Sequence, residues 1–511
     1  MKFILNNETI STDLPAGTTV LDFVRYHQNL KGTKIGCREG DCGACTILVG
    51  ELVGEGVRYR SMTSCLMPLA NAAGRHIVTV EGINPEDGSL TPVQAAMVEA
   101  SGTQCGFCTV GFVMSLTGYC LESAGSPSVS SPHVSKGSAS SLEAAVSAID
   151  GNICRCTGYK SIERAACRIS EALSEPPASA GGQKDDLHVR FVPEYFSDIA
   201  ARLMGLNSSV DDQTGRPLTQ AVLTGGGTDL YVQRPEEMAE RGARTLLYDD
   251  ELRTIIDTGE YIELGASVTV TDLLESPVMQ SIFPDLYKHL KLVSSTPIRN
   301  MATLAGNFVN ASPIGDMTAW FLALDAEIEL AFSTGRNATV RERAASLDIS
   351  NGHASAGDTR RLKLKDLYLG YKQLAKTDDE IITTIRFRKP TGDFRFNFEK
   401  VSKRTYLDIA SVNTAMSLVM KVVNESEIRN PKSEIEFAHV SAGGVAPIPL
   451  YLKETSAFLR GKPVTAETIS QANEIIQTEI SPISDVRGSA EYKRLLLRQL
   501  FTAHFAELFE I

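Results

Sequence analysis

The chain has 511 residues, of which 43% are apolar and 22% are charged, and its formal net charge is −12. This composition is typical of a folded globular chain, and the acidity argues against nucleic acid, whose phosphates attract Lys and Arg. No apolar run reaches the roughly 18 residues of a transmembrane helix, and residues 1–8 are too briefly apolar for a signal peptide. We therefore expect a cytoplasmic protein that binds neither nucleic acid nor membrane.

The first predicted domain spans residues 1–82 and mixes strands with one helix. Apolar residues fall on one face of a helix over residues 19–29, and short apolar runs at 46–49 and 77–80 indicate strands. All ten cysteines lie within the first 167 residues. Because a cytosolic protein has little use for disulfides, thiols gathered at one end of the chain predict metal binding.

A helical domain is predicted next, over residues 83–174. Its first helix has a capping box, with Thr91 as the N-cap and Gln94 at the third helical position. Pro92 lies in the first turn. Residues 123–141 are rich in Ser and indicate a surface loop, and residues 175–187 form a linker. The larger α/β part then divides into segments 188–388 and 389–511.

The first cysteine group has the spacing C-x4-C-x2-C with a more distant fourth thiol, which is the plant-type [2Fe–2S] spacing. Its members are Cys37, Cys42, Cys45 and Cys65. The glycines between them permit the positive φ angles that a loop needs to point N–H groups at cluster sulfides. The alternatives are a structural zinc site and spare buried thiols, but a zinc site usually takes paired C-x2-C units.

The second cysteine group combines a C-x2-C pair with a C-x-C pair, each next to a predicted helix. Its members are Cys105, Cys108, Cys154 and Cys156. Helix N-termini favour thiolates, so this arrangement predicts a second cluster within the helical domain. A redox-active disulfide pair is the alternative, although that motif expects a βαβ context. Cys120 and Cys167 fall in helical patterns, and we expect both to be core thiols and not ligands.

Two later segments carry flavin-like signals. A glycine-rich stretch follows an apolar run and could hold a pyrophosphate through its N–H groups, although such a stretch is often only a turn. Its residues are Leu223, Thr224, Gly225, Gly226, Gly227, Thr228, Asp229 and Leu230. Segment 297–316 is dense in small and amide-bearing residues. The G-x-G-x-x-G pattern is absent, so a Rossmann fold is not predicted.

These motifs together resemble the molybdenum hydroxylases of the xanthine dehydrogenase type. The resemblance is carried by residues 36–45, 104–108 and 151–159 in the cysteine region and by 223–230, 297–316, 367–372, 398–404 and 484–492 beyond it. Cys108 is followed by Thr-Val-Gly where the family usually has Thr-Pro-Gly. The implied fold class is α+β multidomain, with a ferredoxin-like β-grasp domain, a four-helix [2Fe–2S] bundle, a two-part α+β FAD-binding domain and a C-terminal α+β domain.

The resemblance also implies cofactors and their contacts. Cys105, Cys108, Cys154 and Cys156 are expected to hold the cluster nearer the molybdenum, and the first cysteine group the cluster nearer the flavin. Thr303, Asn307 and Asp316 are expected to contact FAD. Lys400 is a candidate charge near the flavin pyrimidine, with a solvated surface lysine as the alternative.

The function that the resemblance implies is electron transfer from molybdenum through two [2Fe–2S] clusters to FAD and then NAD, during oxidation of hypoxanthine and xanthine. Because the chain ends at residue 511, after the flavin part, we expect a molybdopterin-binding large subunit as partner, in a dimer of heterodimers. The same subunit type could serve an aldehyde or another N-heterocycle. A free-standing electron carrier and a zinc-stabilised interaction protein are the alternatives from other classes.

Overall fold

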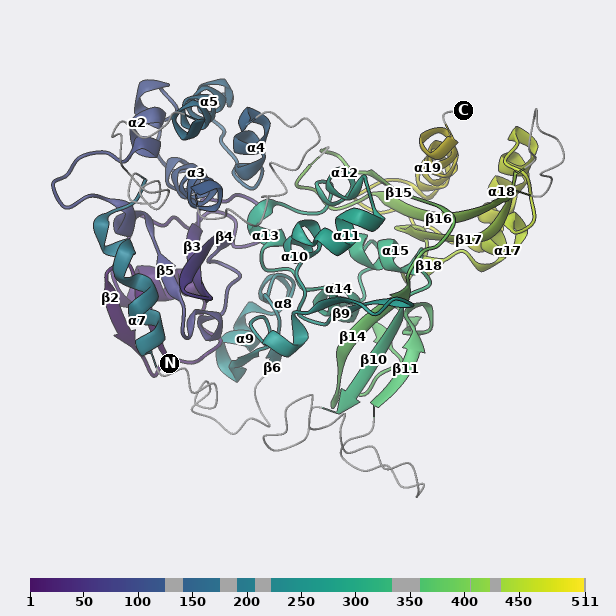
Figure 1. The fold of residues 1–511 in the computed structure, drawn as a ribbon, viewed down its shortest axis with the longest axis horizontal. Helices are drawn as coiled ribbons and strands as arrows, with labels where there is room; N and C mark the ends of the chain where they lie inside the picture. The colour runs from purple at the N-terminus through teal and green to yellow at the C-terminus, as the bar shows by residue number, and fades with distance from the viewer. Residues whose placement is uncertain are drawn as a thin grey trace, which may run out of the picture. The chain divides into compact units, whose positions relative to one another are not determined.

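The computed structural model describes residues 1–124, 141–174, 191–206, 222–332, 359–404, 406–422 and 433–509 (Figure 1). The predicted linker 175–187 and most of the Ser-rich segment 123–141 lie outside these ranges. The chain forms two compact units, one made of residues 1–248, 269–275 and 294–302 and the other of 249–268, 276–293 and 303–511. Across the described ranges, no helix has both the length and the apolar character to cross a bilayer.

A five-stranded sheet opens the first unit, in the order β2-β1-β5-β3-β4. The strands are β1 (Lys2–Leu5), β2 (Glu8–Ser11), β3 (Thr46–Val53), β4 (Gly56–Thr63) and β5 (His76–Val78). The helix predicted over 19–29 is a short α1 (Val20–Asp22) that continues as a π-helical turn, Phe23–His27. Its apolar face packs on the sheet, with Val20 and Phe23 almost fully buried.

Four helices form the bundle of the first unit. They are α2 (Pro92–Glu99), α3 (Thr109–Ala124), α4 (Ser141–Ala148) and α5 (Lys160–Ser174). The predicted capping box starts α2, where Thr91 accepts from the Gln94 N–H and Gln94 accepts from the Thr91 N–H. Helix α3 packs on α4, α5, β3 and β4, so the bundle and the sheet share one apolar core (Figure 1).

The other described residues of the first unit form short elements. They are α7 (Ile199–Gly205), β6 (Val222–Thr224), α8 (Leu230–Gln233), α9 (Pro235–Arg241), β7 (Ala243–Thr245), α10 (Val270–Glu275) and α13 (Thr296–Arg299). Strands β6 and β7 pair in parallel. Helices α10 and α13 also belong to this unit. The chain segments before α10, between α10 and α13, and after α13 belong to the second unit.

The described residues of the second unit form two larger antiparallel sheets and one two-stranded hairpin. The first has the order β11-β10-β14-β9-β8, with β8 (Ile255–Asp257), β9 (Tyr261–Gly265), β10 (Glu327–Phe332), β11 (Thr359–Lys363) and β14 (Glu380–Arg388). It is accompanied by α11 (Pro277–Ile282), α12 (Leu286–Leu290), α14 (Leu304–Asn310), α15 (Asp316–Leu322) and the hairpin β12 (Tyr368–Gly370) with β13 (Gln373–Leu374). Trp320 and Phe321 of α15 lie in an aromatic cluster with Phe283, Phe387 and Phe396.

The second sheet follows the order β15-β16-β17-β18. Its strands are β15 (Asp393–Val401), β16 (Val412–Val422), β17 (Ser433–Gly443) and β18 (Leu450–Tyr451), and α17 (Lys453–Leu459), α18 (Ala466–Glu479) and α19 (Ala490–Phe509) cover it. The chain thus changes sheet between Arg388 and Asp393. The α+β multidomain prediction is confirmed.

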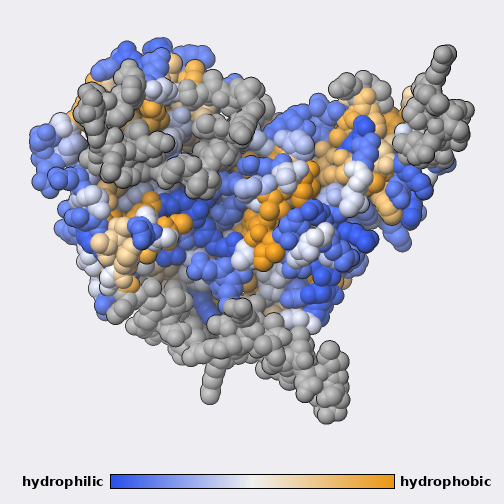
Figure 2. Space-filling view, viewed as in Figure 1, coloured by the Kyte–Doolittle hydropathy of each residue, from blue (hydrophilic) through white to orange (hydrophobic). Residues whose placement is uncertain are grey.

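Apolar residues also reach the surface. On the face seen in Figure 2 they form several separate groups among polar residues. The segment before α19 contributes two strongly exposed apolar side chains, Ile483 and Val486. Scattered exposure of this kind is ordinary for a folded chain and by itself indicates no function.

Candidate iron–sulfur and flavin sites

The first cysteine group lies in the loop before β3 and just after β4. Cys45 and Cys65 are buried, whereas Cys37 and Cys42 are partly exposed. Backbone N–H groups already point at sulfur, because Glu39 and Cys42 donate to Cys37 Sγ at 3.3 and 3.4 Å. Gly40 and Gly43 have φ angles of +78° and +67°, a conformation in which glycine lacks the steric penalty of other residues.

The four thiols of this group form two pairs. A hydrogen bond with Cys42 is the main cause that lowers the pKa of Cys37 to about 5, and the same bond raises the pKa of Cys42. A hydrogen bond between Cys45 and Cys65 likewise lowers the pKa of Cys45 and raises that of Cys65. In each pair the shared hydrogen bond lowers the pKa of one thiol and raises the pKa of the other.

The second cysteine group shows the same pairing. The Sγ atoms of Cys105 and Cys156 lie 3.6 Å apart, and both residues are exposed. Cys108 and Cys154 form the other pair through a side-chain hydrogen bond, and burial is the main cause that raises the pKa of Cys108 to about 12. Along the chain, the C-x2-C motif of Cys105 and Cys108 directly precedes α3, and the C-x-C motif of Cys154 and Cys156 precedes α5, as the sequence predicts.

Paired thiols fit a two-iron cluster better than a single zinc ion. Two thiolates at about 2.3 Å from one tetrahedral metal ion stand about 3.8 Å apart, close to the observed separation of Cys105 and Cys156. Within the described ranges, no three Cys, His, Asp or Glu side chains converge as one ion would require. Two thiols at the separation of Cys105 and Cys156 can bind one iron, and the two pairs in each group together supply the four thiolates of a [2Fe–2S] cluster.

The two remaining cysteines stand apart from these groups. Cys120 is fully buried in the bundle core, and burial raises its pKa. Cys167 lies on α5, with its thiol 3.5 Å from a Glu171 carboxylate oxygen. The core prediction is therefore confirmed for Cys120 and wrong for Cys167, which is only partly buried because it lies on the side of α5 that is not packed in the core.

The glycine-rich stretch lies between β6 and α8, in the first unit. A Cβ on Gly226 would come within 2.0 Å of the Met301 carbonyl oxygen, and one on Gly227 within 2.6 Å of the Leu66 carbonyl oxygen. Asn71 Nδ2 donates to the Gly225 carbonyl at 3.3 Å. Packing of backbone on backbone accounts for these two glycines, so their binding of a pyrophosphate stays a prediction.

Thr303, Asn307 and Asp316 belong to the second unit. Thr303 caps α14, where its Oγ1 accepts from the Gly306 N–H at 3.2 Å. The Asn307 Oδ1 accepts from the N–H and the hydroxyl of Thr318 at 3.1 and 2.9 Å. These polar side chains therefore order the two short helices that carry them.

Lys400 is buried, with 1% of its side chain exposed, which excludes the solvated-lysine alternative. Its Nζ donates to Asp316 Oδ2 and to the Leu292 carbonyl, both at 2.7 Å. Asn413 donates to the other Asp316 oxygen at 2.6 Å, and within the described part of the chain its own buried Oδ1 accepts no hydrogen bond. An orphaned acceptor beside a charged pair fits a site for a polar group such as FAD.

Asn413 is a candidate that the sequence did not reveal, because a lone Asn within a β-strand resembles any strand residue. A second such candidate is Asn152, between α4 and α5. The only sign of it in the sequence is its position two residues before Cys154. Both are almost fully buried. Buried amides are hydrogen-bonded in most proteins, so their partners determine what they do.

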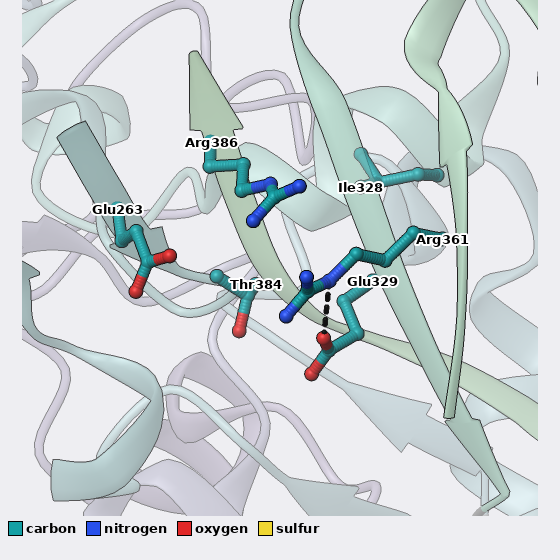
Figure 3. Close-up of a pocket in the computed structure, with 6 residues that line it drawn as sticks. All are labelled: Glu263, Ile328, Glu329, Arg361, Thr384 and Arg386. Atoms are coloured by element: carbon teal, nitrogen blue, oxygen red, sulfur yellow. Dashed lines mark hydrogen bonds and ion pairs between the residues drawn. The ribbon is translucent and has the colours of Figure 1, made fainter. Parts of the chain in front are cut away.

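A small depression of about 100 Å³ lies on the outer face of the first sheet of the second unit (Figure 3). Side chains of four strands line it, and Figure 3 shows Arg361 paired with Glu329, which are 2.8 Å apart. Arg386, at its rim, pairs with Glu327 at 2.6 Å. Paired surface ions in so small a space indicate a solvated sheet face and not a cofactor site.

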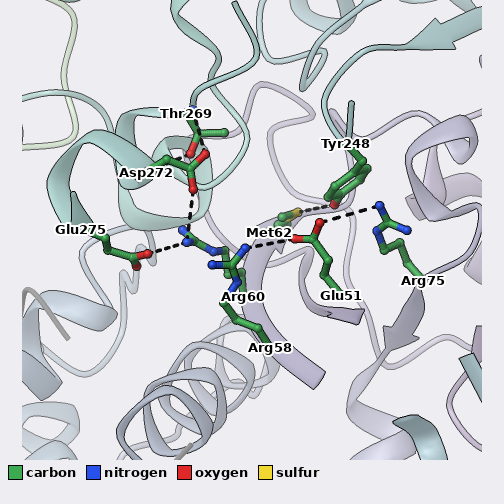
Figure 4. A network of polar contacts seen from close by, with 9 residues as sticks. All are labelled: Glu51, Arg58, Arg60, Met62, Arg75, Tyr248, Thr269, Asp272 and Glu275. Atoms are coloured by element: carbon green, nitrogen blue, oxygen red, sulfur yellow. Dashed lines mark hydrogen bonds and ion pairs between the residues drawn. The ribbon is translucent and has the colours of Figure 1, made fainter. Parts of the chain in front are cut away.

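A polar network lies in the first unit around β4 (Figure 4). Arg60, with 6% of its side chain exposed, contacts Glu275 at 2.6 Å and Asp272 at 3.4 Å on α10. Beside it the Arg75 guanidinium lies 4.0 Å from the centre of the Tyr248 ring. The strand that leads to Cys65 is thus held to segments more than 180 residues later in the chain.

Four family models match the chain in sequence. They are a 2Fe-2S iron-sulfur cluster binding domain at residues 3–70, a [2Fe-2S] binding domain at 79–167, the FAD binding domain in molybdopterin dehydrogenase at 195–343, and the CO dehydrogenase flavoprotein C-terminal domain at 398–508. Their order is the order of the predicted domains. Two [2Fe–2S] clusters and FAD are therefore the cofactors of this chain.

Xanthine dehydrogenases are among the proteins to which this chain is similar. That of Blastobotrys adeninivorans is 26% identical over 98% of this chain, and xanthine dehydrogenase 1 of Arabidopsis thaliana is 27% identical over 96%. The chain spans 40% and 38% of the length of these two relatives. Among solved structures, a carbon monoxide dehydrogenase from Hydrogenophaga pseudoflava is 23% identical, with a TM-score of 0.46 over 57% of this chain and 91% of that one.

The fold, the paired thiols and the matched domains define a two-cluster iron–sulfur flavoprotein. More narrowly, the chain carries the iron–sulfur and FAD domains of the molybdenum hydroxylase family.

Proposed function

We propose that this chain is the electron-transfer subunit of a xanthine dehydrogenase, and that a partner protein carries the molybdenum cofactor. In this role the chain passes electrons from the partner to FAD and then to NAD while hypoxanthine and xanthine are oxidised. The observation that carries the proposal is the assembly of eight cysteines into four close pairs, two pairs in each iron–sulfur domain.

The eight thiols would hold two [2Fe–2S] clusters, which supply one-electron transfer when bound. Cys37, Cys42, Cys45 and Cys65 are the proposed ligands of one cluster and Cys105, Cys108, Cys154 and Cys156 those of the other. The two sets are connected by a direct backbone contact, because the Ile153 N–H donates to the Cys42 carbonyl at 3.0 Å. Short connections of this kind suit a chain whose task is to keep redox centres close together.

The flavin contacts are proposed for two sets of residues. Glycines 225–227 would approach the pyrophosphate, since they lack a Cβ. Thr303, Asn307, Asp316 and Lys400 would contact the rest of FAD, with Asn413 as an added candidate. The buried Lys400–Asp316 pair and the orphaned Asn413 oxygen support this assignment.

A docking role for the helical bundle follows from what it exposes. Cys105 and Cys156 are at the surface, and the neighbouring Phe107 and Tyr159 are 45% and 39% exposed. A cluster open to water is easily lost or oxidised, and exposed aromatic side chains are enriched at protein interfaces. We propose that the molybdopterin-binding subunit covers this surface, and that a free-standing carrier is the less suitable description.

The test is to purify the chain with any protein that co-purifies with it and to measure iron, FAD and molybdenum per chain. We expect molybdenum only in the complex, and NADH formation when hypoxanthine and NAD are added to it. Activity with an aldehyde or another N-heterocycle instead of hypoxanthine would assign a different molybdenum hydroxylase. A colourless chain that contains zinc would contradict the proposal.

A further inference from the structure

The turn between α4 and α5 holds a buried amide between the two iron–sulfur loops. Asn152 is 5% exposed, and its Nδ2 donates to the Gly43 carbonyl at 3.1 Å. Its Oδ1 accepts from the Ser115 hydroxyl of α3 at 2.7 Å. One side chain therefore connects the Cys42–Cys45 loop, the helix that follows Cys108 and the turn that leads into Cys154.

Glycines allow these three segments to approach each other. A Cβ on Gly111 of α3 would lie 2.1 Å from the Gly43 carbonyl oxygen, and a Cβ on Gly43 would lie 2.2 Å from that of Gly151. No side chain fits between the segments at these points. Gly43 also has a φ of +67°, which glycine adopts without strain.

This packing brings Cys42, a proposed ligand of one cluster, into hydrogen-bond contact with the residue next to Cys154, a proposed ligand of the other. The Ile153 N–H donates to the Cys42 carbonyl at 3.0 Å, and Ile153 is bonded directly to Cys154. Asn152, the next residue back along the chain, makes the parallel bond to Gly43. The two bonds together fix both the distance and the orientation of one loop against the other.

The Gly43 carbonyl does not need the hydrogen bond from Asn152, because it has other donors. The Gly43 carbonyl also accepts from the N–H and the hydroxyl of Thr46, at 3.1 and 2.7 Å. Removal of the amide would leave Gly43 hydrogen-bonded within its own loop. What disappears is a connection between loops, so the role of Asn152 lies in their relative placement.

We propose that Asn152, oriented by Ser115, is a positioning residue that sets the separation of the two iron–sulfur clusters. This inference rests on the proposed function, in which both thiol groups carry clusters. Because electron exchange between centres falls steeply with distance, such a residue controls how well the two clusters communicate without contributing a ligand to either.

The test compares Asn152→Ala and Gly111→Ala with the wild-type full chain. All three proteins carry their clusters and are reduced with dithionite. Iron is measured first, and EPR then records the magnetic interaction between the reduced clusters, which falls with the cube of their separation. Gly56→Ala is the matched control, because a Cβ there meets nothing within 4 Å. Alanine also favours a helix more than glycine does, so helix propensity alone would not disturb Gly111→Ala.

We expect full iron in each variant, a weaker magnetic interaction in Asn152→Ala and Gly111→Ala, and a wild-type interaction in Gly56→Ala. Full iron together with an unchanged interaction in Asn152→Ala would overturn the proposal, whatever Gly111→Ala shows. If Asn152→Ala loses iron, Ser115→Ala decides by the same criterion, since it keeps the amide and removes only the hydroxyl that orients it. A wild-type chain without two reducible clusters would overturn the proposed function itself.

Discussion

At the scale of single residues, the pairing of thiols distinguishes the proposed ligands from the other two cysteines. Cys105→Ser removes one member of an exposed pair whose sulfurs are 3.6 Å apart, so we expect loss of the bundle cluster and about half of the iron, because hydroxyl is a poor replacement for a thiolate ligand. Cys167→Ser is the control, since its thiol lies in neither group. Iron and inorganic sulfide analysis checks this, and equal iron in both variants would contradict the ligand assignment.

Lys400 offers a residue-scale test of the flavin site with an internal control. Lys400 and Lys493 are alike, because each is at most 3% exposed and pairs with one carboxylate at 2.7 Å and one backbone carbonyl at 2.7 or 3.0 Å. Lys400→Met should lower the free energy of unfolding by about 2–4 kcal/mol, since the Asp316 carboxylate, 13% exposed, loses its cation. Lys493→Met should cost less, because the Asp485 carboxylate is 35% exposed. Only Lys400→Met should also lower FAD content, which flavin absorbance per chain measures. Equal FAD content in the two variants would remove Lys400 from the proposed site.

Glu122 provides a pH dependence at the same scale. Burial is the main cause that raises its pKa from 4.5 to about 7, and Glu275 adds to it. The folded chain therefore holds a proton that the unfolded chain releases, so this residue lowers stability as pH rises from about 4.5 to 7.

Glu122→Gln should then stabilise the chain by on the order of 1 kcal/mol at pH 8, with little gain at pH 5. Thermal unfolding across this pH range measures the difference. Glu99→Gln is the control, because the Glu99 carboxylate is 62% exposed. If the gain in stability did not depend on pH, protonation of Glu122 would not be its cause.

At the scale of elements, Arg60 determines how β4 is held to α10. Arg60→Met leaves Asp272 and Glu275 without their buried cation, and we expect a loss of about 3 kcal/mol in the free energy of unfolding. Arg58→Met, on the same strand, should cost less than about 1 kcal/mol, because its side chain is 39% exposed. Denaturant unfolding of both variants measures this, and equal losses would mean that the network adds nothing beyond packing.

Elements whose signals are local in sequence could be predicted, and those defined by distant contacts could not. The capping box of α2 and the helix starts after Cys108 and Cys156 depend on residues within a few positions of each other, so their patterns are visible in the sequence. The attachment of β4 to α10 joins residues 212 and 215 positions apart, and no local pattern encodes it. The same holds for Asn413, whose partner Asp316 is 97 positions away.

At the scale of the whole molecule, the two [2Fe–2S] clusters and FAD determine how many electrons the chain can store. One electron for each cluster and two for the flavin give about four per chain. A reductive titration of the purified chain, followed by visible absorbance, should end near this value. Cys105→Ser should end one electron earlier and Lys400→Met about two earlier, because each variant is expected to lack a different cofactor.

The same preparation separates what this chain does from what its proposed partner does. NADH should bleach the flavin bands of the chain alone, because the proposed function places electron exchange between FAD and NAD on this chain. Hypoxanthine should bleach nothing until a molybdenum-containing partner is added, and the cluster bands should then change together with those of the flavin. If hypoxanthine reduced the isolated chain, substrate oxidation would have to occur on this chain, and the division of labour between two subunits would be wrong.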